Sequence, residues 1–405
     1  MKSNKITGRD QVKQRGNDII CFGGEDWWYH NQAHIDMQLM RRFARGNTVL
    51  YINSIVMQKA NLGEGTTFVR RLLRKTRSIV TGLRKSQTGF WVYSPFTLPI
   101  HHLTWGRTLH KKMLEYQLRL VVHRLGISNP IVWVACPAAC DVALEMKKIR
   151  LIYQRTDRFE EYPNVSVEAI RRYDRMLKAH ADLTVFVSST LYNEEAGQCK
   201  KAIYLDHGVD FDMFASVSAN NGHPEEMRRI SKPIVGFFGD IEDHLLDAEL
   251  VEKVVDLLPQ MSFVFVGKRL GDLTNLDSKK NVWFLGQKPY EQIPHYGKWF
   301  DVAVMPWRQT RWIEAVNPIK LKEYLALGKP VVSTPFPELQ KYLDVVYQAR
   351  TAEEFARCIE LALAEDGPER IAARRKKVQP FTWDAKADFV LKTLFDETDD
   401  FRGAD

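Results

Sequence analysis

Short apolar runs alternate with longer segments of helical spacing along the whole chain. In the first half, apolar runs typical of strands occupy residues 19–22, 49–52, 90–93, 131–135, 151–153, 183–187 and 202–205. In the second half they occupy residues 234–238, 262–266, 282–285, 302–305 and 331–333. Between them, apolar residues recur at helical spacing, as at 33–45, 109–125, 248–258 and 319–327. Strands separated by helices predict parallel sheets with helices on both faces, so we predict an α/β fold.

The chain divides into two doubly wound halves, which a polar stretch at 214–233 separates. We predict a Rossmann-like N-terminal domain over 1–213 and a Rossmann-like C-terminal domain over 214–385. A C-terminal helix or tail over 386–405 is expected to pack back on the N-terminal domain. Ligands of open parallel sheets lie at the carboxyl ends of the strands, so we expect the two domains to face each other across one ligand cleft.

The length and composition fit this reading. The 405 residues are 45% hydrophobic and 27% charged, which is enough for two domains with separate cores. The longest nearly apolar run, 131–139, contains a proline and is about half as long as a membrane span. The basic first 18 residues lack the apolar stretch of a secretory signal, so we expect a cytoplasmic protein.

The five cysteines are odd in number and scattered, which favours a reducing compartment over a disulfide framework. Cys136 and Cys140 are spaced like one half of a metal site, but no second pair follows them. We therefore expect no zinc.

The net charge of +8 is unevenly distributed. Residues 1–210 hold 32 Lys and Arg against 19 Asp and Glu, whereas the remainder is acidic. The densest basic segment, 69–85, interleaves apolar residues with cations that include Arg70, Arg71, Arg74 and Lys75. That pattern is typical of a helix on an anionic membrane surface, although a solvated basic face has the same composition. Nucleic-acid binding is disfavoured because no recognised nucleic-acid module accompanies the charge.

The most informative segment is a helix expected after the loop that follows residues 302–305. Asn317 is a good N-cap and Pro318 fits the first helical position, while Gly328 and Pro330 end the helix. Its free amides would point into the cleft, ready for phosphate oxygens. Lys320 adds a positive charge, and Glu323 lies on the same face, where it is suited to accept hydrogen bonds from a ribose. An ordinary surface pair is the alternative reading of these two side chains.

This segment, NPIKLKEYLALGKPVVST, resembles the donor-nucleotide signature of GT-B glycosyltransferases of the family 4 type. It is most similar to bacterial cell-surface polysaccharide enzymes of the teichuronic acid type. The resemblance continues through HGVDFDMF, IVGFFGDIEDHLLDAEL, FVFVGK and NVWFLGQKPYEQIPHY, in the family's order. Together these segments cover most of residues 203–335.

The resemblance implies a retaining transfer of a sugar from a nucleotide-sugar to an acceptor bound by the N-terminal domain. It implies that Glu323 binds the donor ribose and that the helix start faces the diphosphate through Asn317, Pro318, Ile319 and Lys320. It also implies that a glycine turn ending at Gly239 lets the backbone approach the donor. We expect Lys268 and Arg308 to be further cations near the diphosphate.

The chain departs from the family pattern in one important place. Many relatives carry two glutamates eight positions apart, but position 315 is alanine and Glu314 is one place off. This leaves an alternative function open, a catalytically degenerate GT-B module that acts as a membrane-associated scaffold. A dinucleotide oxidoreductase is set aside because no G-x-G-x-x-G motif follows an early strand.

The proposed chemistry needs positive potential where the diphosphate leaves. A helix N-terminus, Lys320 and Arg308 are expected to supply it, so we expect no metal and no cofactor. The triplet Asp210, Phe211 and Asp212 matches a metal-binding Asp-x-Asp motif, but the resemblance explains it as part of the crossover between the domains.

The acceptor side is expected to follow the first strand. We expect Gly23 and Gly24 to allow close backbone approach. A cluster suited to contact a sugar ring accompanies them: Glu25, Asp26, Trp27, Trp28, His30, Gln32 and His34. The alternative is that the aromatic residues fill a domain edge.

Asp157, after a middle strand, is expected to orient the acceptor hydroxyl or share its proton. An ion pair with Arg155 or Arg158 is the alternative. We expect the acceptor to be a lipid-linked glycan. The protein itself is expected to be peripheral and to bind this acceptor at the inner face of the cell membrane.

Overall fold

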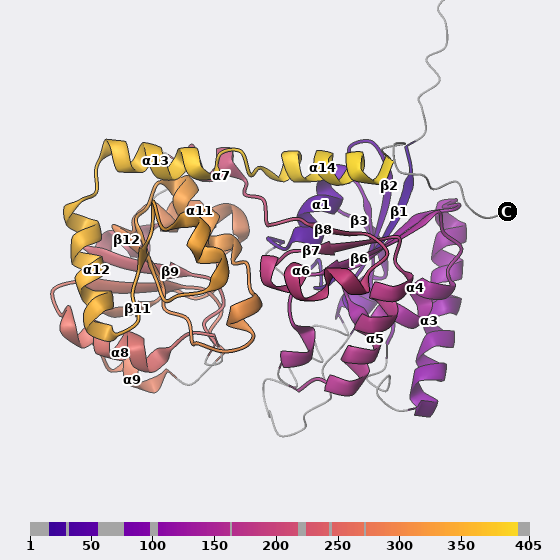
Figure 1. Ribbon diagram of the computed structural model, residues 1–405, viewed down its shortest axis with the longest axis horizontal. Helices are drawn as coiled ribbons and strands as arrows, with labels where there is room; N and C mark the ends of the chain where they lie inside the picture. Colours follow the sequence, from indigo (N-terminus) through magenta and orange to yellow (C-terminus); the bar gives the residue numbers. More distant parts are fainter. Residues whose placement is uncertain are drawn as a thin grey trace, which may run out of the picture.

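The computed structural model describes residues 16–29, 32–55, 77–97, 104–162, 164–217, 224–242, 245–270 and 273–395. Two α/β domains lie next to each other, and the last helix runs from the second domain back to the first (Figure 1). Within the described ranges, no helix combines the length and the hydropathy needed to cross a bilayer.

The N-terminal domain is built on an eight-stranded sheet of order β3-β4-β2-β1-β5-β6-β7-β8, in which only the β3–β4 pair is antiparallel. Its strands are β1 (Asp18–Phe22), β2 (Thr48–Ile52), β3 (Leu83–Lys85), β4 (Trp91–Tyr93), β5 (Ile131–Val134), β6 (Arg150–Arg155), β7 (Leu183–Phe186) and β8 (Ala202–Tyr204). Its helices include α1 (Ile35–Phe43), α3 (Thr104–Leu125), α4 (Cys140–Glu145), α5 (Val167–His180) and α6 (Ser189–Glu195).

The C-terminal domain is built on a six-stranded parallel sheet of order β11-β10-β9-β12-β13-β14. Its strands are β9 (Ile234–Phe238), β10 (Ser262–Val266), β11 (Val282–Phe284), β12 (Val302–Met305), β13 (Val331–Ser333) and β14 (Tyr347–Gln348). Its helices include α7 (Phe211–Ala215), α8 (Ala248–Leu257), α9 (Thr274–Asp277), α10 (Ile293–Gly297), α11 (Ile319–Leu327), α12 (Ala352–Ala364) and α13 (Pro368–Val378). This is the strand order of a dinucleotide-fold domain, with the switch point between β9 and β12.

Each sheet is buried on both faces, as the apolar runs predict. In β1, Ile19 and Cys21 face one core and Ile20 and Phe22 face the other. In the same way, β9 contributes to two separate cores. Strands that are covered on both sides appear in the sequence as continuous apolar runs, so the predicted strands are confirmed. The short, partly exposed strands β3 and β14 were missed.

The predicted boundary between residues 213 and 214 falls inside helix α7, which begins at Phe211. Phe214 of this helix is buried in a core of the C-terminal domain. The returning helix α14 (Trp383–Phe395) also begins before the predicted 386. It packs on α1, and Trp383, Ala387 and Val390 complete a core of the N-terminal sheet (Figure 1).

The two chain segments that pass between the domains lie against each other. The backbone N–H of Val209 donates to the Phe381 carbonyl at 2.8 Å. A Cβ atom at Gly208 would come within 2.7 Å of the Trp383 ring, so only glycine allows this approach. The linkage between the domains is therefore a pair of hydrogen-bonded segments.

We predict that Trp383→Ala lowers the free energy of unfolding by about 3–5 kcal/mol, because it removes a fully buried indole from the core beneath α14. Urea denaturation of the full chain measures this. Trp283→Ala is the matched control, since Trp283 is 38% exposed and its loss should cost less than about 1 kcal/mol. Equal losses in the two variants would contradict the anchoring role of Trp383.

Candidate functional site

A cleft of about 400 Å³ lies between the domains, and both domains line it. From the C-terminal domain it is lined by the amino end of α11 and by residues that follow the carboxyl ends of strands, including Gly239, Asp240, Lys268 and Trp307. The N-terminal domain contributes Glu25, His34, Thr156, Asp157 and Tyr162. The two predicted carboxyl edges therefore share one cleft.

Helix α11 begins one residue later than predicted. Pro318 is the N-cap residue, with extended backbone angles, and no side chain caps the helix. Instead, the side-chain amide of Asn317 reaches the other domain and donates a hydrogen bond to the Val187 carbonyl at 2.9 Å. The predicted stop is confirmed, because Gly328 adopts φ +81° at the C-cap. The first amides of α11 consequently have no capping side chain, and Asn317, Pro318, Ile319 and Lys320 all line the cleft.

Lys320 is held at this amino end between two aromatic rings. Its ammonium lies 4.8 Å from the centre of the Phe237 ring and 4.9 Å from that of Trp307. Burial lowers the pKa of Lys320, while Asp240, Glu323 and Glu242 favour its charged form. Gly239, at φ +133°, allows this position, because a Cβ atom there would lie 2.4 Å from the ammonium nitrogen.

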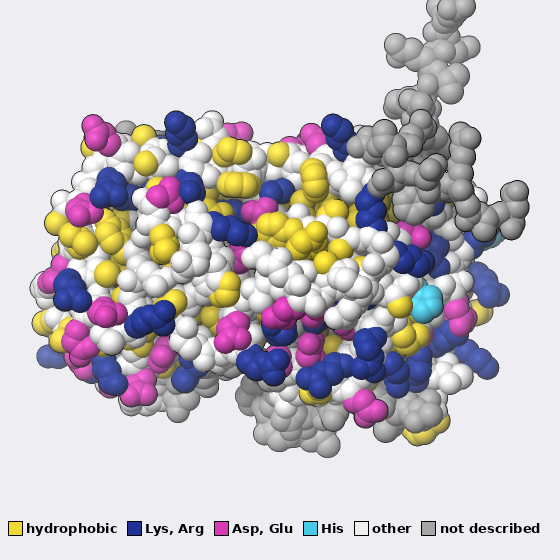
Figure 2. All heavy atoms as spheres, viewed as in Figure 1, with side chains coloured by type: hydrophobic (Ala, Val, Ile, Leu, Met, Phe, Trp, Pro, Cys, Tyr) yellow, Lys and Arg dark blue, Asp and Glu magenta, His cyan; other side chains and the backbone are white. Residues whose placement is uncertain are grey.

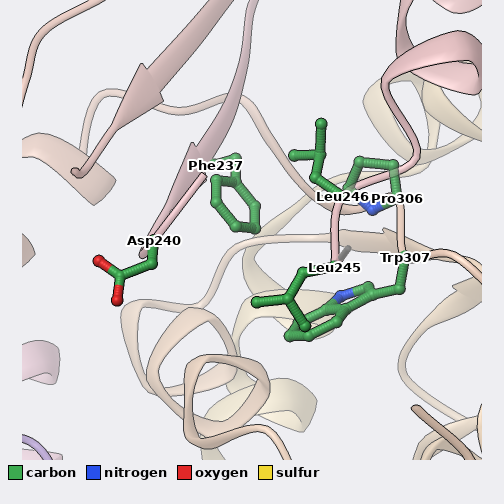
Figure 3. Close-up of a pocket in the computed structure, with 6 residues that line it drawn as sticks. All are labelled: Phe237, Asp240, Leu245, Leu246, Pro306 and Trp307. Atoms are coloured by element: carbon green, nitrogen blue, oxygen red, sulfur yellow. The ribbon is translucent and has the colours of Figure 1, made fainter. Parts of the chain in front are cut away.

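A small apolar cavity adjoins the cleft behind these rings. It has a volume of about 10 Å³ and shares Asp240, Leu245 and Trp307 with the lining of the cleft. Figure 3 shows Leu245 and Trp307 packed side by side, while the Asp240 carboxylate points away from them. A space of this size holds at most one water molecule, so it is too small to bind a ligand.

Glu323 lies one turn deeper and is 4% exposed. Its Oε1 accepts a hydrogen bond from the Tyr290 hydroxyl at 3.1 Å. Burial raises the pKa of Glu323 to about 7, against the opposing effects of Tyr290 and Lys320. Lys320 and Glu323 are therefore not a solvated surface pair, because Glu323 is buried and the half-buried Lys320 is packed against two aromatic rings in the cleft.

Asp157 faces the cleft from the N-terminal domain. Its Oδ2 accepts from the Tyr162 hydroxyl at 3.0 Å, and burial raises its pKa. The alternative of an ion pair is not observed, since Arg155 bonds Glu160 and Glu195, and Arg158 bonds Glu194. Arg155 belongs to a buried ionic network with Asp174, Lys178 and Glu195, whereas Arg158 pairs with the exposed Glu194.

Only part of the cluster predicted in and after the glycine loop of β1 lines the cleft. Glu25 lines the cleft, whereas Gly23, Gly24, Asp26 and Trp27 do not. Trp27 is 3% exposed and packs edge-on against Tyr51 and Phe90. The carboxylate of Asp26 accepts from the Trp28 amide and the Ser78 hydroxyl, and Gly24 donates to Asp36. The tight turn needs these residues for its own packing.

Several other predicted residues also lie elsewhere. Arg308 is absent from the lining, and its backbone amide donates to Leu245 in the loop behind it. The Asp210 carboxylate pairs with Arg42. His30 and the basic residues Arg70, Arg71, Arg74 and Lys75 fall outside the described residues. Over the described part of the chain, no group of three or more His, Cys, Asp or Glu side chains is placed to hold a metal ion.

Sequence reasoning missed the aromatic residues that bridge the cleft. Tyr162 of the N-terminal domain packs edge-on against Trp312 of the C-terminal domain, with ring centroids 5.5 Å apart. Tyr290, which positions Glu323, was also missed. Tyr162 stands five residues after Asp157, in the polar loop that follows β6, so its position after a strand was the available signal.

Comparison with known proteins agrees with this geometry. Residues 232–365 match the family model described as glycosyl transferases group 1. The chain is 29% identical over 192 residues to a protein of Bacillus subtilis (strain 168) named "Putative teichuronic acid biosynthesis glycosyltransferase TuaH". That alignment covers 44% of this chain and 47% of the relative, so the chain matches about half the length of this curated relative.

Solved structures match nearly the whole chain. Sucrose-phosphate synthase from Thermosynechococcus elongatus superposes with a TM-score of 0.68 at 14% identity, covering 94% of this chain and 100% of that one. Anabaena HepE in complex with UDP and glucose superposes with a TM-score of 0.64 at 15% identity, covering 94% and 99%. At such identities the likeness concerns the fold. The chain thus has the predicted GT-B fold of two facing Rossmann-like domains, and most of its C-terminal domain is similar to the group 1 glycosyltransferase model.

Proposed function

We propose that this protein is a glycosyltransferase that moves a sugar from a nucleoside-diphosphate sugar to a glycan acceptor in cell-surface polysaccharide synthesis. The observation that carries the proposal is the uncapped amino end of α11, with Lys320 and Glu323 beside it, at the floor of an interdomain cleft. The match to the group 1 family supports it, as does the structure of HepE in complex with UDP-glucose.

In the proposed mechanism, the donor diphosphate lies against the first amides of α11 and the Lys320 ammonium. As the bond from the anomeric carbon to the diphosphate oxygen breaks, negative charge grows on the leaving group, and these fixed donors stabilise it. The positive potential comes from the protein, so we propose a transfer that requires no metal ion. Glu323 accepts hydrogen bonds from the ribose, and the hydrogen bond from Tyr290 holds the Glu323 carboxylate in place.

The acceptor hydroxyl is proposed to approach from the N-terminal domain, where Asp157 and Glu25 line the cleft. A carboxylate accepts the hydrogen bond of a hydroxyl and so orients its oxygen toward the anomeric carbon. We also propose that the transfer retains configuration, which the resemblance to family 4 enzymes supports. We further propose that the acceptor is lipid-linked and that this protein binds it as a peripheral protein at the cytoplasmic face of the membrane.

We predict that Glu323→Ala weakens UDP binding and donor-dependent transfer by about tenfold or more, because it removes hydrogen bonds to a charged acceptor. Glu314→Ala is the matched control, since Glu314 is an exposed glutamate outside the lining of the cleft. A thermal-shift screen of UDP, GDP, ADP, CMP and dTDP selects the base, and calorimetry then measures both variants. A chain that binds none of these nucleotides would favour the scaffold alternative.

We predict that Lys320→Met weakens UDP binding by about tenfold while uridine binding changes by less than about twofold, because Lys320 is proposed to contact only the diphosphate. Isothermal titration of both ligands measures the two ratios on one variant. Equal losses for UDP and uridine would instead indicate that Lys320 supports the shape of the whole cleft.

We predict that affinity for UDP-glucose rises with pH between about 6 and about 8 and then levels off. With the pKa of Glu323 raised to about 7, the accepting carboxylate is lost as pH falls through that value. The diphosphate diester of a nucleotide-sugar does not titrate in this range, unlike the terminal phosphate of UDP. The variant Glu323→Gln should flatten the profile, whereas an unchanged profile in this variant would contradict the assignment of the titration to Glu323.

A further inference from the structure

The outer face of α3 exposes an unusual set of large apolar side chains. Trp105 is 65% exposed, Leu109 43%, Tyr116 66% and Leu120 56%. Separations of four, eleven and fifteen residues bring all of them to one side of the helix. The opposite side is also apolar, because Leu114, Leu118 and Val121 are buried in the core beneath it. The outer set is therefore not needed for folding of the domain.

The apolar surface continues beyond the helix through Phe96, which is 46% exposed. Gln117 fixes this residue to α3, because its side chain accepts from the Phe96 amide at 2.8 Å and donates to the Phe96 carbonyl at 3.0 Å. We call this surface, formed by Phe96, Trp105, Leu109, Tyr116 and Leu120, the α3 face.

Cations are interspersed with these apolar residues. Lys112, Arg119 and Arg124 are exposed on α3, and Lys112 and Arg119 form no ion pair with any described residue. The one acidic residue of the helix, Glu115, is partly buried and lies 3.8 Å from Lys111. The α3 face thus combines large apolar groups with uncompensated positive charge.

The surroundings extend the positive charge. Figure 2 shows Lys and Arg side chains gathered over the α3 and α5 side of the N-terminal domain, whereas both signs mix over the C-terminal domain. Helix α3 lies at the side of its domain away from the C-terminal domain (Figure 1). None of its residues lines the cleft, so an occupant of the α3 face would leave the donor site open.

This composition distinguishes a lipid surface from a protein partner. The centre of a protein interface is depleted in lysine, because burying an unpaired ammonium is costly. At a bilayer surface, tryptophan and tyrosine lie at the headgroup level, and long basic side chains extend to anionic headgroups. Lys112 and Arg119 alternate along the helix with Leu109, Tyr116 and Leu120, which suits the bilayer and not the protein interface.

We propose that the α3 face is the surface by which this protein docks on an anionic lipid bilayer, with Trp105 and Tyr116 inserted at the headgroup level and Lys112 and Arg119 on the lipid phosphates. The inference rests on the proposed function at one point only, which is that a lipid-linked acceptor would require the protein to reach a membrane. It assigns the contact to an element other than the basic run at 69–85.

The test is co-sedimentation of the full chain with vesicles of equimolar phosphatidylglycerol and phosphatidylcholine, and with phosphatidylcholine alone. The wild type should bind the mixed vesicles and bind phosphatidylcholine at least about tenfold more weakly. Lys112→Glu/Arg119→Glu should lose at least about tenfold of the binding at low salt. Trp105→Ser/Tyr116→Ser should lose binding at low and high salt alike, because apolar insertion is not screened.

Matched controls come from the C-terminal domain. Arg357→Glu/Lys376→Glu reverses the same number of exposed charges, and Leu257→Ser/Leu361→Ser removes two exposed apolar side chains. Both controls should sediment like the wild type. All variants should keep the wild-type melting temperature and UDP-induced thermal shift, which separates loss of docking from loss of the donor site.

Three outcomes would overturn the proposal. Wild-type sedimentation of either α3 variant would show that the face does not dock, and equal binding to both vesicle types would exclude recognition of anionic lipid. A wild-type dimer in analytical ultracentrifugation that becomes monomeric in Trp105→Ser/Tyr116→Ser would assign the face to a second copy of the chain.

Discussion

A buried lysine of α11 constrains how the two domains are positioned relative to each other. Lys322 is 2% exposed, and its ammonium bonds the Asp206 carboxylate and the His207 carbonyl, both in the segment that crosses between the domains. Burial lowers the pKa of Lys322 to about 8, and Asp206 opposes that shift. Lys386 of α14 bonds the same carboxylate. Because a buried charge is costly unless it is paired, one carboxylate holds α11, the crossover and the returning helix together.

This arrangement explains why α11 lacks a polar face. Successive residues of the helix meet different neighbours: Lys320 and Glu323 line the cleft, Lys322 meets the crossover, and the Tyr324 hydroxyl accepts from the Phe238 amide at 2.8 Å. Of its nine residues, Leu321 to Leu327 are all buried. The helix is therefore positioned from both domains, which places its amino end, Lys320 and Glu323 at the floor of the cleft.

The sequence predicts those features that depend on local patterns. Continuous apolar runs identify the buried parallel strands, and Gly328 marks the end of α11 through its left-handed backbone. The positions of Lys320 and Glu323 in the cleft were predictable, because both side chains belong to this helix. It was not predictable where partners are distant in sequence: Asn317 bonds a carbonyl 130 residues away instead of capping its own helix. Trp27 is likewise an aromatic residue of the kind that stacks on a sugar ring, but it packs against Tyr51 and Phe90 in the core.

The returning helix has a consequence for biosynthesis. Trp383, Ala387 and Val390 belong to a core of the N-terminal sheet, yet they are translated only after the sheet of the C-terminal domain. Until they emerge, the surface of α1 that they cover stays open to water, although the rest of that domain was translated first. The nascent N-terminal domain therefore carries an exposed apolar face throughout synthesis of the C-terminal domain, the interval in which a chaperone would be most needed.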